Sequence, residues 1–367
     1  MEFQRVFGQS RVKQILASSL QRDRLAHAYL FHGQPGIGKD GMALSLAMGL
    51  HCTKDAQGGC GECPSCQKIL RLEHPCFTLV LPVPSQPKKM KENKYNELIR
   101  DHALKRLHNP YQEINYSPEF STLPLIGIDQ IRALKKSVRF KLVEGQTRII
   151  LISHADRLTP TASNSLLKIL EEPPRGTMLI LTTSIPARLL QTIISRCQVI
   201  RFDPLPEKDV ENALLSLTDI SPEKATFFAR VAGGSIQNGL SLYVNDFEAQ
   251  RAQAISFLQA ALDRNSLNRV DSIESLIQET DKQGMQKLLQ ILLIWLRDLM
   301  CLKLGDRGKI INFDRMDTLE TFHKNWPKLD TGKAIKHVEQ AIDFIEKNVY
   351  LTLIIHSLSV DLHKCQY

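Results

Sequence analysis

Apolar residues in the first two hundred positions form short runs that alternate with amphipathic stretches. One stretch, 40–50, is rich in Ala, Leu and Met and has the spacing of a helix. Four runs have the length and composition of buried strands: Ala28–Phe31, Phe77–Val83, Arg148–Ser153 and Met178–Thr182. Strands that alternate with helices predict a mainly parallel sheet covered on both faces, and so an α/β fold.

The pattern changes after Pro204–Pro206, where strand-like runs stop. Short helical stretches follow, with a break at Gly233 and Gly234, and helical spacing then continues to Tyr367. We therefore predict an α/β domain at 1–205, a small helical domain at 206–246 and a larger helical domain at 247–367.

One segment, 84–119, interrupts the α/β pattern. It contains four prolines, and between Lys88 and Arg106 seven basic residues face three acidic ones. Its centre, Tyr95–Leu107, fits a short helix. A solvated insertion fits this composition, and so does a segment that contacts a partner or DNA.

Composition narrows the class of protein. With 43% hydrophobic and 23% charged residues over 367 positions, the chain is globular. No apolar run approaches the ~20 residues that span a bilayer, and the N-terminus lacks the pattern of a signal peptide. We expect a cytoplasmic protein with no membrane partner. Its net charge of +8 is compatible with a polyanionic partner such as nucleic acid.

Four of the eight cysteines are crowded together, at Cys52, Cys60, Cys63 and Cys66. Disulfides are unexpected in a cytoplasmic chain, and short Cys-x2-Cys steps let four thiolates close a tetrahedral shell on zinc. Glycines around the second cysteine permit the tight turns that this requires. We predict a structural zinc site with no open coordination position. The alternative is four buried cysteines without a metal.

A glycine-rich loop follows the first apolar run and opens a helix. Its residues Gly33, Gly36, Gly38 and Lys39 have the spacing of a phosphate-binding loop, in which backbone amides cradle phosphates and the lysine reaches the terminal ones. The next position should hold a Ser or Thr that binds Mg²⁺, but it holds Asp40. This carboxylate would repel a triphosphate or serve as a favourable charge at the helix N-terminus. Nucleotide binding therefore stays open.

The acidic motif that should accompany such a loop is also altered. An apolar strand ends in Ser153 and His154, where an Asp for the metal and an acidic residue to activate water are expected. Asp156 follows, three residues beyond the expected metal position, and we place it in a loop. These changes predict that the chain does not hydrolyse ATP by itself.

Several motifs in combination resemble the bacterial clamp-loader ATPases, an AAA+ family. The stretch 163–174, SNSLLKILEEPP, is similar to the signature that follows their degenerate acidic motif. Thr182–Ser184 is similar to their phosphate-sensing strand end, and Ser195–Cys197 to their trans-acting arginine motif. The resemblance covers most of residues 1–245. It implies an AAA+ P-loop domain with an inserted zinc knuckle, a helical lid and a C-terminal helical collar.

Within that family, a hydrolysing motor subunit would carry a hydroxyl at position 40, an Asp-Glu pair at 153–154 and an Arg at position 237. This chain has Asp40, Ser153, His154 and Gln237, while the arginine motif is intact. The resemblance therefore implies a non-hydrolysing subunit that supplies Arg196 as an arginine finger to a neighbouring ATP site. A vestigial nucleotide site would involve the following residues: Gly33, Gly36, Gly38, Lys39, Asp40 and Thr183.

The resemblance also implies partners. These are gamma/tau and delta subunits, a sliding clamp, and primed DNA bound through the assembled complex. The chain would belong to the DNA polymerase III holoenzyme, which is a nucleotidyltransferase. Basic residues at Arg132, Lys135, Lys136 and Arg139 share one face of a predicted helix. This face is either a DNA-backbone contact or a solvated surface.

Two other functions stay open at this point. One is a hydrolysing gamma/tau-like motor subunit that binds magnesium through Asp40 or Asp156. The other is a stand-alone, zinc-containing DNA-binding protein with a relic nucleotide fold.

Overall fold

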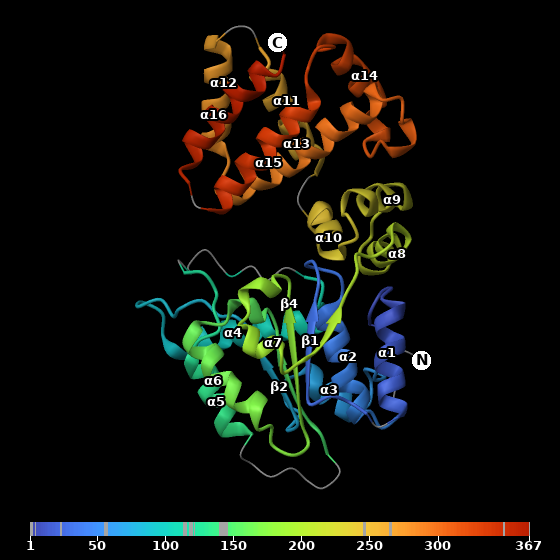
Figure 1. The fold of residues 1–367 in the computed structure, drawn as a ribbon, viewed down its shortest axis with the longest axis vertical. Helices are drawn as coiled ribbons and strands as arrows, with labels where there is room; N and C mark the ends of the chain where they lie inside the picture. The colour runs from blue at the N-terminus through green and yellow to red at the C-terminus, as the bar shows by residue number, and fades with distance from the viewer. Residues whose placement is uncertain are drawn as a thin grey trace. The chain divides into compact units, whose positions relative to one another are not determined.

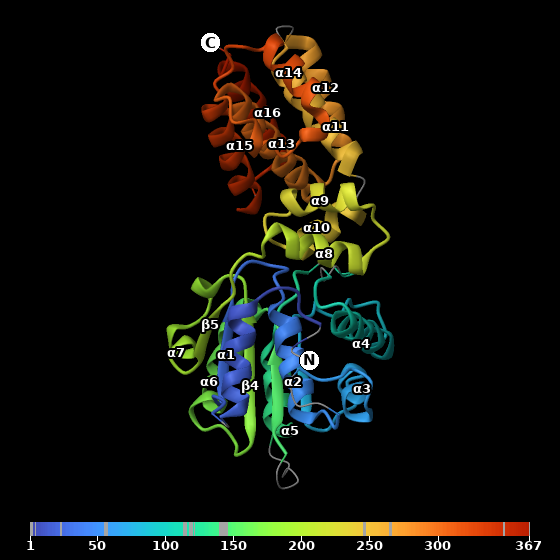
Figure 2. The ribbon, with the colours of Figure 1, turned by 90° about the vertical axis from the view of Figure 1, so that its right-hand side faces the viewer.

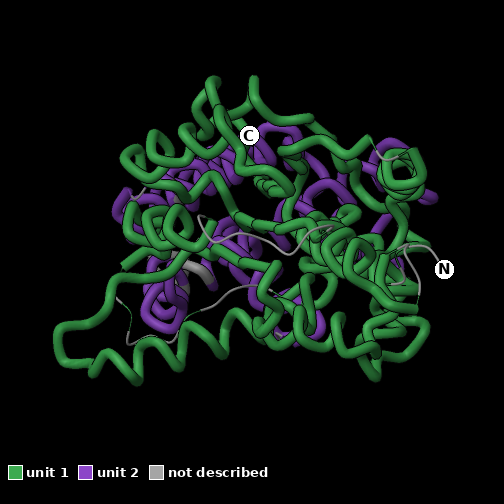
Figure 3. The backbone as a smooth tube through the Cα atoms, turned by 90° about the horizontal axis from the view of Figure 1, so that it is seen from below, with its two compact units in different colours: residues 1–240 green, residues 241–367 purple. Residues whose placement is uncertain are grey.

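The computed structural model describes most of the chain, namely residues 3, 5–22, 24–54, 58–112, 116, 120, 122–138, 146–244, 247–263, 266–347 and 349–366. Contacts divide the chain into two compact units, 1–240 and 241–367 (Figure 3). Each unit has its own secondary structure and core. The predicted division of the first 246 residues into an α/β domain and a separate lid stays a prediction.

The first unit is built on a parallel sheet of five strands with the order β2-β3-β4-β1-β5. Both β3 and β4 are buried along their whole length. This confirms the α/β fold that the alternating pattern predicts. The strands are β1 (Ala28–His32), β2 (Phe77–Val80), β3 (Arg148–Ile152), β4 (Thr177–Thr183) and β5 (Gln198–Arg201).

Helices cover both faces of this sheet (Figure 1). Successive residues of a strand point to opposite faces, so Tyr29 and Phe31 join one hydrophobic cluster while Ala28 and Leu30 join the other. The first face carries α1 (Ser10–Gln21), α2 (Lys39–His51), α3 (Pro64–Leu70) and, through one leucine, α4 (Glu92–His108). The second face carries α5 (Ile128–Ser137), α6 (Pro160–Glu171) and α7 (Gln191–Ile194).

Two strand boundaries differ from the predicted ones. Strand β2 ends at Val80, because the prolines at 82 and 84 lack the N–H that a ladder needs. Val83 instead exchanges two backbone hydrogen bonds with Leu125 in an isolated antiparallel bridge. Strand β5 was not predicted, since three of its four residues are exposed at the sheet edge and leave no apolar run.

The insertion contains a longer helix than predicted. Helix α4 spans 17 residues, and Figure 2 shows it above α3 on the same side of the sheet. Its last turn carries Leu107, which is buried in the first hydrophobic cluster. The C-terminal part of the insertion is therefore anchored to the core.

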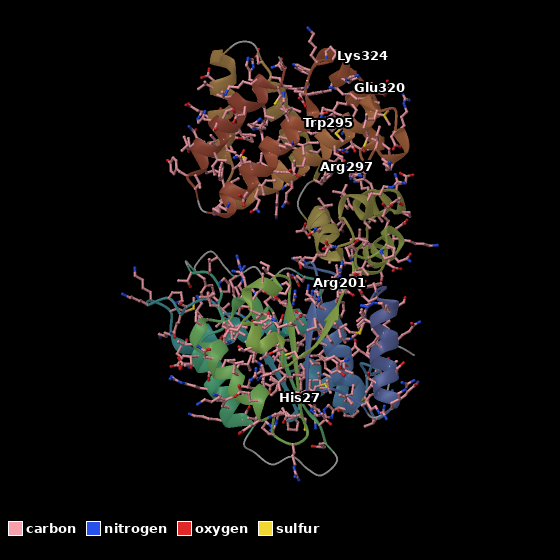
Figure 4. The ribbon with its side chains drawn as sticks, in the orientation of Figure 1. His27, Arg201, Trp295, Arg297, Glu320 and Lys324 are labelled. Atoms are coloured by element: carbon pink, nitrogen blue, oxygen red, sulfur yellow. The ribbon has the colours of Figure 1, made fainter. Side chains whose placement is uncertain are left out.

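All strands end at the same edge of the sheet. Figure 4 shows His27, just before β1, at one end and Arg201, the last residue of β5, at the other. The glycine-rich loop 33–39 leaves β1 beside Arg201, because His32 and Arg201 are paired in register. Parallel sheets bind ligands at this carboxyl edge.

Three short helices follow the sheet: α8 (Glu207–Leu217), α9 (Pro222–Val231) and α10 (Ile236–Val244). The segment before α10 contacts the glycine-rich loop. The Ser235 hydroxyl donates to Pro35 O at 2.9 Å, and Ile236 N–H donates to Gly36 O at 3.0 Å. The lid residues 235–237 are thus fixed to the loop.

The second unit is helical, as predicted. In the part of the chain that the structure describes, no helix is both long and apolar enough to cross a membrane. The α-helices of the second unit are α11 (Phe247–Ala261), α12 (Ser266–Glu279), α13 (Lys282–Lys303), α14 (Met316–Asn325), α15 (Thr331–Glu346) and α16 (Leu351–Lys364). Short 3₁₀ helices complete both units: η1 (Ala155–Arg157), η2 (Pro186–Arg188), η3 (Arg307–Lys309) and η4 (Phe313–Arg315).

Candidate nucleotide site and cysteine cluster

The glycine-rich loop has the strand–loop–helix setting that the sequence predicts. Gly36 and Gly38 have φ angles of 72° and 97°, which favour glycine, and Gly38 caps α2. A Cβ atom added to Gly36 would lie 2.3 Å from Cβ of Gln237. Gln237, which stands where a motor subunit would place an arginine, therefore lies directly on the loop.

The ammonium group of Lys39 turns back onto its own loop. It donates to Gly33 O at 2.7 Å, to Gln34 O at 2.6 Å and to the Ser184 hydroxyl at 3.2 Å. These three bonds use all the hydrogens of an ammonium group. Burial lowers the pKa of Lys39 to about 8, against the opposing effect of Asp40.

Asp40 is buried and fully engaged. Its Oδ1 accepts from the Thr182 hydroxyl at 2.5 Å, and its Oδ2 accepts from the Ser153 hydroxyl at 2.5 Å. The guanidinium of Arg106 also donates to Oδ2, from Nη2 at 2.7 Å and from Nε at 3.1 Å. Neither carboxylate oxygen is left without a partner. Asp40 is thus the negatively charged centre of a buried hydrogen-bond network.

Arg106 reaches this site from the last turns of α4, in the insertion. Its side chain is only 10% exposed, and Nη1 donates to Gln112 O. Nη2 lies 3.4 Å from His154 Nε2. His154 has a φ of 52°, in the left-handed region, and is the second residue after the end of β3. The insertion therefore forms one wall of the candidate nucleotide site.

Opposite charges meet within this cluster. Burial alone would raise the pKa of Asp40, but Arg106, His154 and the two hydroxyl donors hold it well below its usual value. Burial lowers the pKa of His154, against the opposing charges of Asp40 and Asp156. Asp156 has a cation of its own, since Nε of Arg157 lies 4.0 Å from its Oδ2. Arg106 therefore supplies the main counter-charge of Asp40.

Asp156 lies in η1 and binds the end of β4. Its Oδ1 accepts from the Thr183 hydroxyl at 2.7 Å and from Ser184 N–H at 3.4 Å. The predicted loop position of Asp156 is thus a short 3₁₀ turn beside the end of β4. Its carboxylate positions that strand end.

The hydroxyl and the carboxylate have exchanged places relative to a motor subunit. There, a hydroxyl follows the lysine and a carboxylate ends the neighbouring strand. Here, Asp40 follows the lysine and Ser153 directly follows β3, and the two side chains are still hydrogen-bonded. The contact between the residue after the lysine and the residue after β3 is kept. The carboxylate now lies at the start of α2 and not at the end of the strand.

The four predicted zinc ligands lie together. The sulfur atoms of Cys52, Cys60, Cys63 and Cys66 all lie within 4.8 Å of one another, and none is in a disulfide. Backbone N–H groups of residues 60, 62, 63 and 66 donate to these sulfurs at 3.3–3.5 Å. Such bonds favour thiolates, so the donor set fits a tetrahedral, thiolate-bound metal ion.

Arg196 lies at the surface after α7. Its Nη1 donates to Thr192 O at 3.0 Å, and Nη2 lies 3.0 Å from Glu171 at the end of α6. Both partners are partly exposed, so the ion pair contributes no more than about 1 kcal/mol. Arg196 can therefore leave Glu171 at little cost.

Comparison with known proteins identifies the family. Residues 8–206 match the family model described as DNA polymerase III, delta subunit, and residues 246–349 match its C-terminal counterpart. DNA polymerase III subunit delta' of Bacillus subtilis (strain 168) is 32% identical over 316 residues, which cover 85% of this chain and 83% of that protein. The chain belongs to the delta-prime family of DNA polymerase III subunits. It is a clamp-loader subunit, as the resemblance of its motifs implies.

More distant relatives also match. DNA polymerase III subunit tau/gamma of Haemophilus influenzae is 29% identical over 248 residues, 65% of this chain and 30% of that protein. A solved gamma subunit-related protein of Thermotoga maritima has 15% identity, with a TM-score of 0.42 and coverage of 97% and 99% of the two chains.

The basic helix face is described only in part. Helix α5 forms where predicted, with Arg132 and Lys136 exposed and Lys135 half-buried. Arg132 pairs with Asp129 at 3.1 Å, and Arg139 lies outside the described residues. A contact between this face and DNA stays a prediction.

Removing the charge of Arg106 should destabilise the chain strongly. Arg106→Gln leaves a buried carboxylate alone and should lower the free energy of unfolding, measured by urea titration, by ~3–5 kcal/mol. In the wild type the pKa of Asp40 is depressed, so this stabilisation is complete above roughly pH 4 and is lost below it. In the variant, burial raises that pKa, so stability should increase as the pH falls from 7.

Arg100→Gln is the matched control, because Arg100 lies on the same helix in an exposed pair with Glu73 at 3.8 Å. It should cost less than about 1 kcal/mol at any pH. Equal losses for the two variants would show that the Arg106–Asp40 pair does not stabilise the fold.

Proposed function

We propose that this chain is a non-hydrolysing subunit of a clamp loader, and that it completes a neighbour's ATP site in place of having one. The observation that carries this is the state of Asp40. Its carboxylate stands where a magnesium-binding hydroxyl is needed, and Arg106, Ser153 and Thr182 already occupy it.

Space and charge both oppose a bound triphosphate. The residues around the loop enclose a cavity of about 20 Å³, room for on the order of one water molecule. The amine of Lys39 is bound to the loop, and the guanidinium of Arg106 is bound to Asp40. A triphosphate would have to displace Arg106 and leave Asp40 as an unpaired, buried charge.

A motor subunit that binds magnesium through Asp40 is therefore disfavoured. Both oxygens of Asp40 are engaged, and Oδ2 faces a guanidinium where a metal cation would have to be. Asp156 holds the end of β4 through Thr183 and Ser184. A stand-alone DNA-binding protein is disfavoured by the family, whose members are subunits of DNA polymerase III.

Arg196 is the residue we assign to the neighbour's ATP site. It lies in the motif Ser195–Cys197, and its guanidinium is held only by a surface carboxylate and one backbone carbonyl. A guanidinium that reaches a transferring phosphoryl group neutralises its developing charge, which is worth ~10³–10⁵ in rate where such fingers have been measured.

The partners follow from the family. Relatives are named as tau, gamma and delta' subunits of DNA polymerase III. We infer that the chain assembles with gamma/tau and delta subunits in the cytoplasm, and that the complex places a sliding clamp on primed DNA. The four cysteines would hold a structural zinc ion, which closes the turn between α2 and α3 and has no site for a substrate.

Restoring the missing features should create nucleotide binding. Asp40→Thr combined with Arg106→Gln supplies the hydroxyl and removes the guanidinium without leaving a charge unpaired. Titration with a fluorescent ATP analogue should show no saturation for the wild type up to about 1 mM, and a measurable Kd for the double variant. Asp40→Thr alone, which keeps Arg106, is the control. Micromolar binding by the wild type would contradict a closed site.

Arg196→Ala should slow ATP hydrolysis by the assembled loader. With motor subunits, clamp and primed DNA present, the rate at the ATP site that Arg196 serves should fall by ~10³ or more, because its phosphoryl group loses a cation. Rapid-quench phosphate release measures this loss. Arg188→Ala is the control, since Arg188 is exposed in the nearby η2. Normal turnover by a fully assembled Arg196→Ala loader would overturn the assignment.

The purified chain should contain one zinc ion. Cys66→Ser removes a ligand and should release the metal to a chelator and lower the melting temperature, since structural zinc contributes directly to folding. Cys76→Ser should keep the metal, because Cys76 is buried outside the cluster and donates to Gln146. Metal analysis of both variants is the measurement. Zinc retention by Cys66→Ser at wild-type affinity would rule out this ligand set.

A further inference from the structure

The segment before α1 packs directly on the cysteine cluster. Phe3 is fully buried and shares a hydrophobic cluster with Cys63 and Cys66. A Cβ atom added to Gly58 would lie 2.5 Å from the backbone nitrogen of Phe3. The first described residues of the chain are therefore part of the wall around the four sulfur atoms.

Arg5 lies on the turn that carries the ligands. A Cβ atom added to Gly61 would be 3.6 Å from Nη2 of Arg5 and 3.7 Å from its Nε. Gly61 separates Cys60 from Cys63 and has a φ of 75°, so the turn presents its backbone to the guanidinium without a side chain between them. The positive group of Arg5 thus lies beside the cluster.

This guanidinium has no carboxylate partner in the part of the chain that the structure describes. Its Nη1 is buried and lacks a hydrogen-bond acceptor there. Glu62, the acidic residue next to the ligands, pairs at the exposed surface with Lys54. A half-buried cation with a buried, unpaired Nη1 indicates a different anion.

The loaded cluster would be that anion. Four thiolates around a divalent ion carry two net negative charges, and the N–H groups that donate to the sulfurs spread this charge without neutralising it. Groups outside the ligand shell that stabilise it are known to raise metal affinity. The half-buried guanidinium of Arg5 beside Gly61 is placed to do this.

We propose that Arg5 is the counter-charge of the metal-loaded cysteine cluster. It acts through its charge, because none of the four sulfurs accepts a hydrogen bond from its buried Nη1. Arg5 is thus a positioning residue for metal retention and not a ligand. The inference rests on the proposed zinc site and extends it to a residue 47 positions before the first cysteine, the difference between 52 and 5.

Three substitutions in the full-length chain test the proposal. Competition with a chromogenic chelator measures the Kd for zinc. Arg5→Gln should raise this Kd about tenfold or more, because the charge is lost. Arg5→Lys should stay close to the wild type, because the charge is kept. Lys54→Gln is the matched control: Lys54 is a cation of the same module, but it is exposed and paired with Glu62.

The outcomes distinguish a failure of the proposed zinc site from a failure of the role proposed for Arg5. If the wild type holds no zinc, the proposed zinc site fails, whatever Arg5 does. If the wild type holds zinc and Arg5→Gln behaves as Lys54→Gln does, the role of Arg5 is wrong. Thermal melts with and without zinc detect a purely packing role: Arg5→Gln would then lower both melting temperatures equally and leave the Kd unchanged. Equal zinc loss from Arg5→Lys and Arg5→Gln would also overturn a role through charge.

Discussion

A carboxylate that is buried away from water needs a positive charge beside it. The packing of the first unit supplies such a charge to Asp40. The charge comes from Arg106, 66 residues further along the chain. To deliver it, the last turns of α4 pack against the core through Leu107. The next residues then line the loop, with Pro110 against Gly41 and the Tyr111 hydroxyl accepting from Phe7 N–H. The insertion is therefore a structural part of the site it closes.

The need to neutralise the buried Asp40 also accounts for the preserved glycine-rich loop. In sequence, the residues at positions 40, 153 and 237 are three separate departures from the pattern expected of a motor subunit. In the structure they are coupled, because Ser153 donates to Asp40 and Gln237 lies on Gly36. The loop needs its glycines to bring Lys39 back onto the carbonyls of Gly33 and Gln34. Its conformation therefore serves internal hydrogen bonds of the chain.

Sequence alone could predict the features that depend on local pattern. Apolar runs located β1, β3 and β4, glycine spacing located the phosphate loop, and cysteine spacing located the four clustered sulfurs. It could not predict β5, whose exposed residues leave no hydrophobic signal. Nor could it predict which of seven basic residues in the insertion would pair with Asp40, because that choice depends on how α4 packs. A carboxylate at position 40 was the one available signal that a cation had to come from elsewhere.

The exchange of a hydroxyl for a carboxylate at position 40 also limits how this lineage can change. A mutation that restores the hydroxyl first leaves the buried guanidinium of Arg106 without its carboxylate. A mutation that removes Arg106 first leaves the buried carboxylate of Asp40 without its cation. Each single change therefore gives a less stable protein, so the two positions would have to change together. The stability of the fold thus couples the residue at position 40 to the residue at position 106.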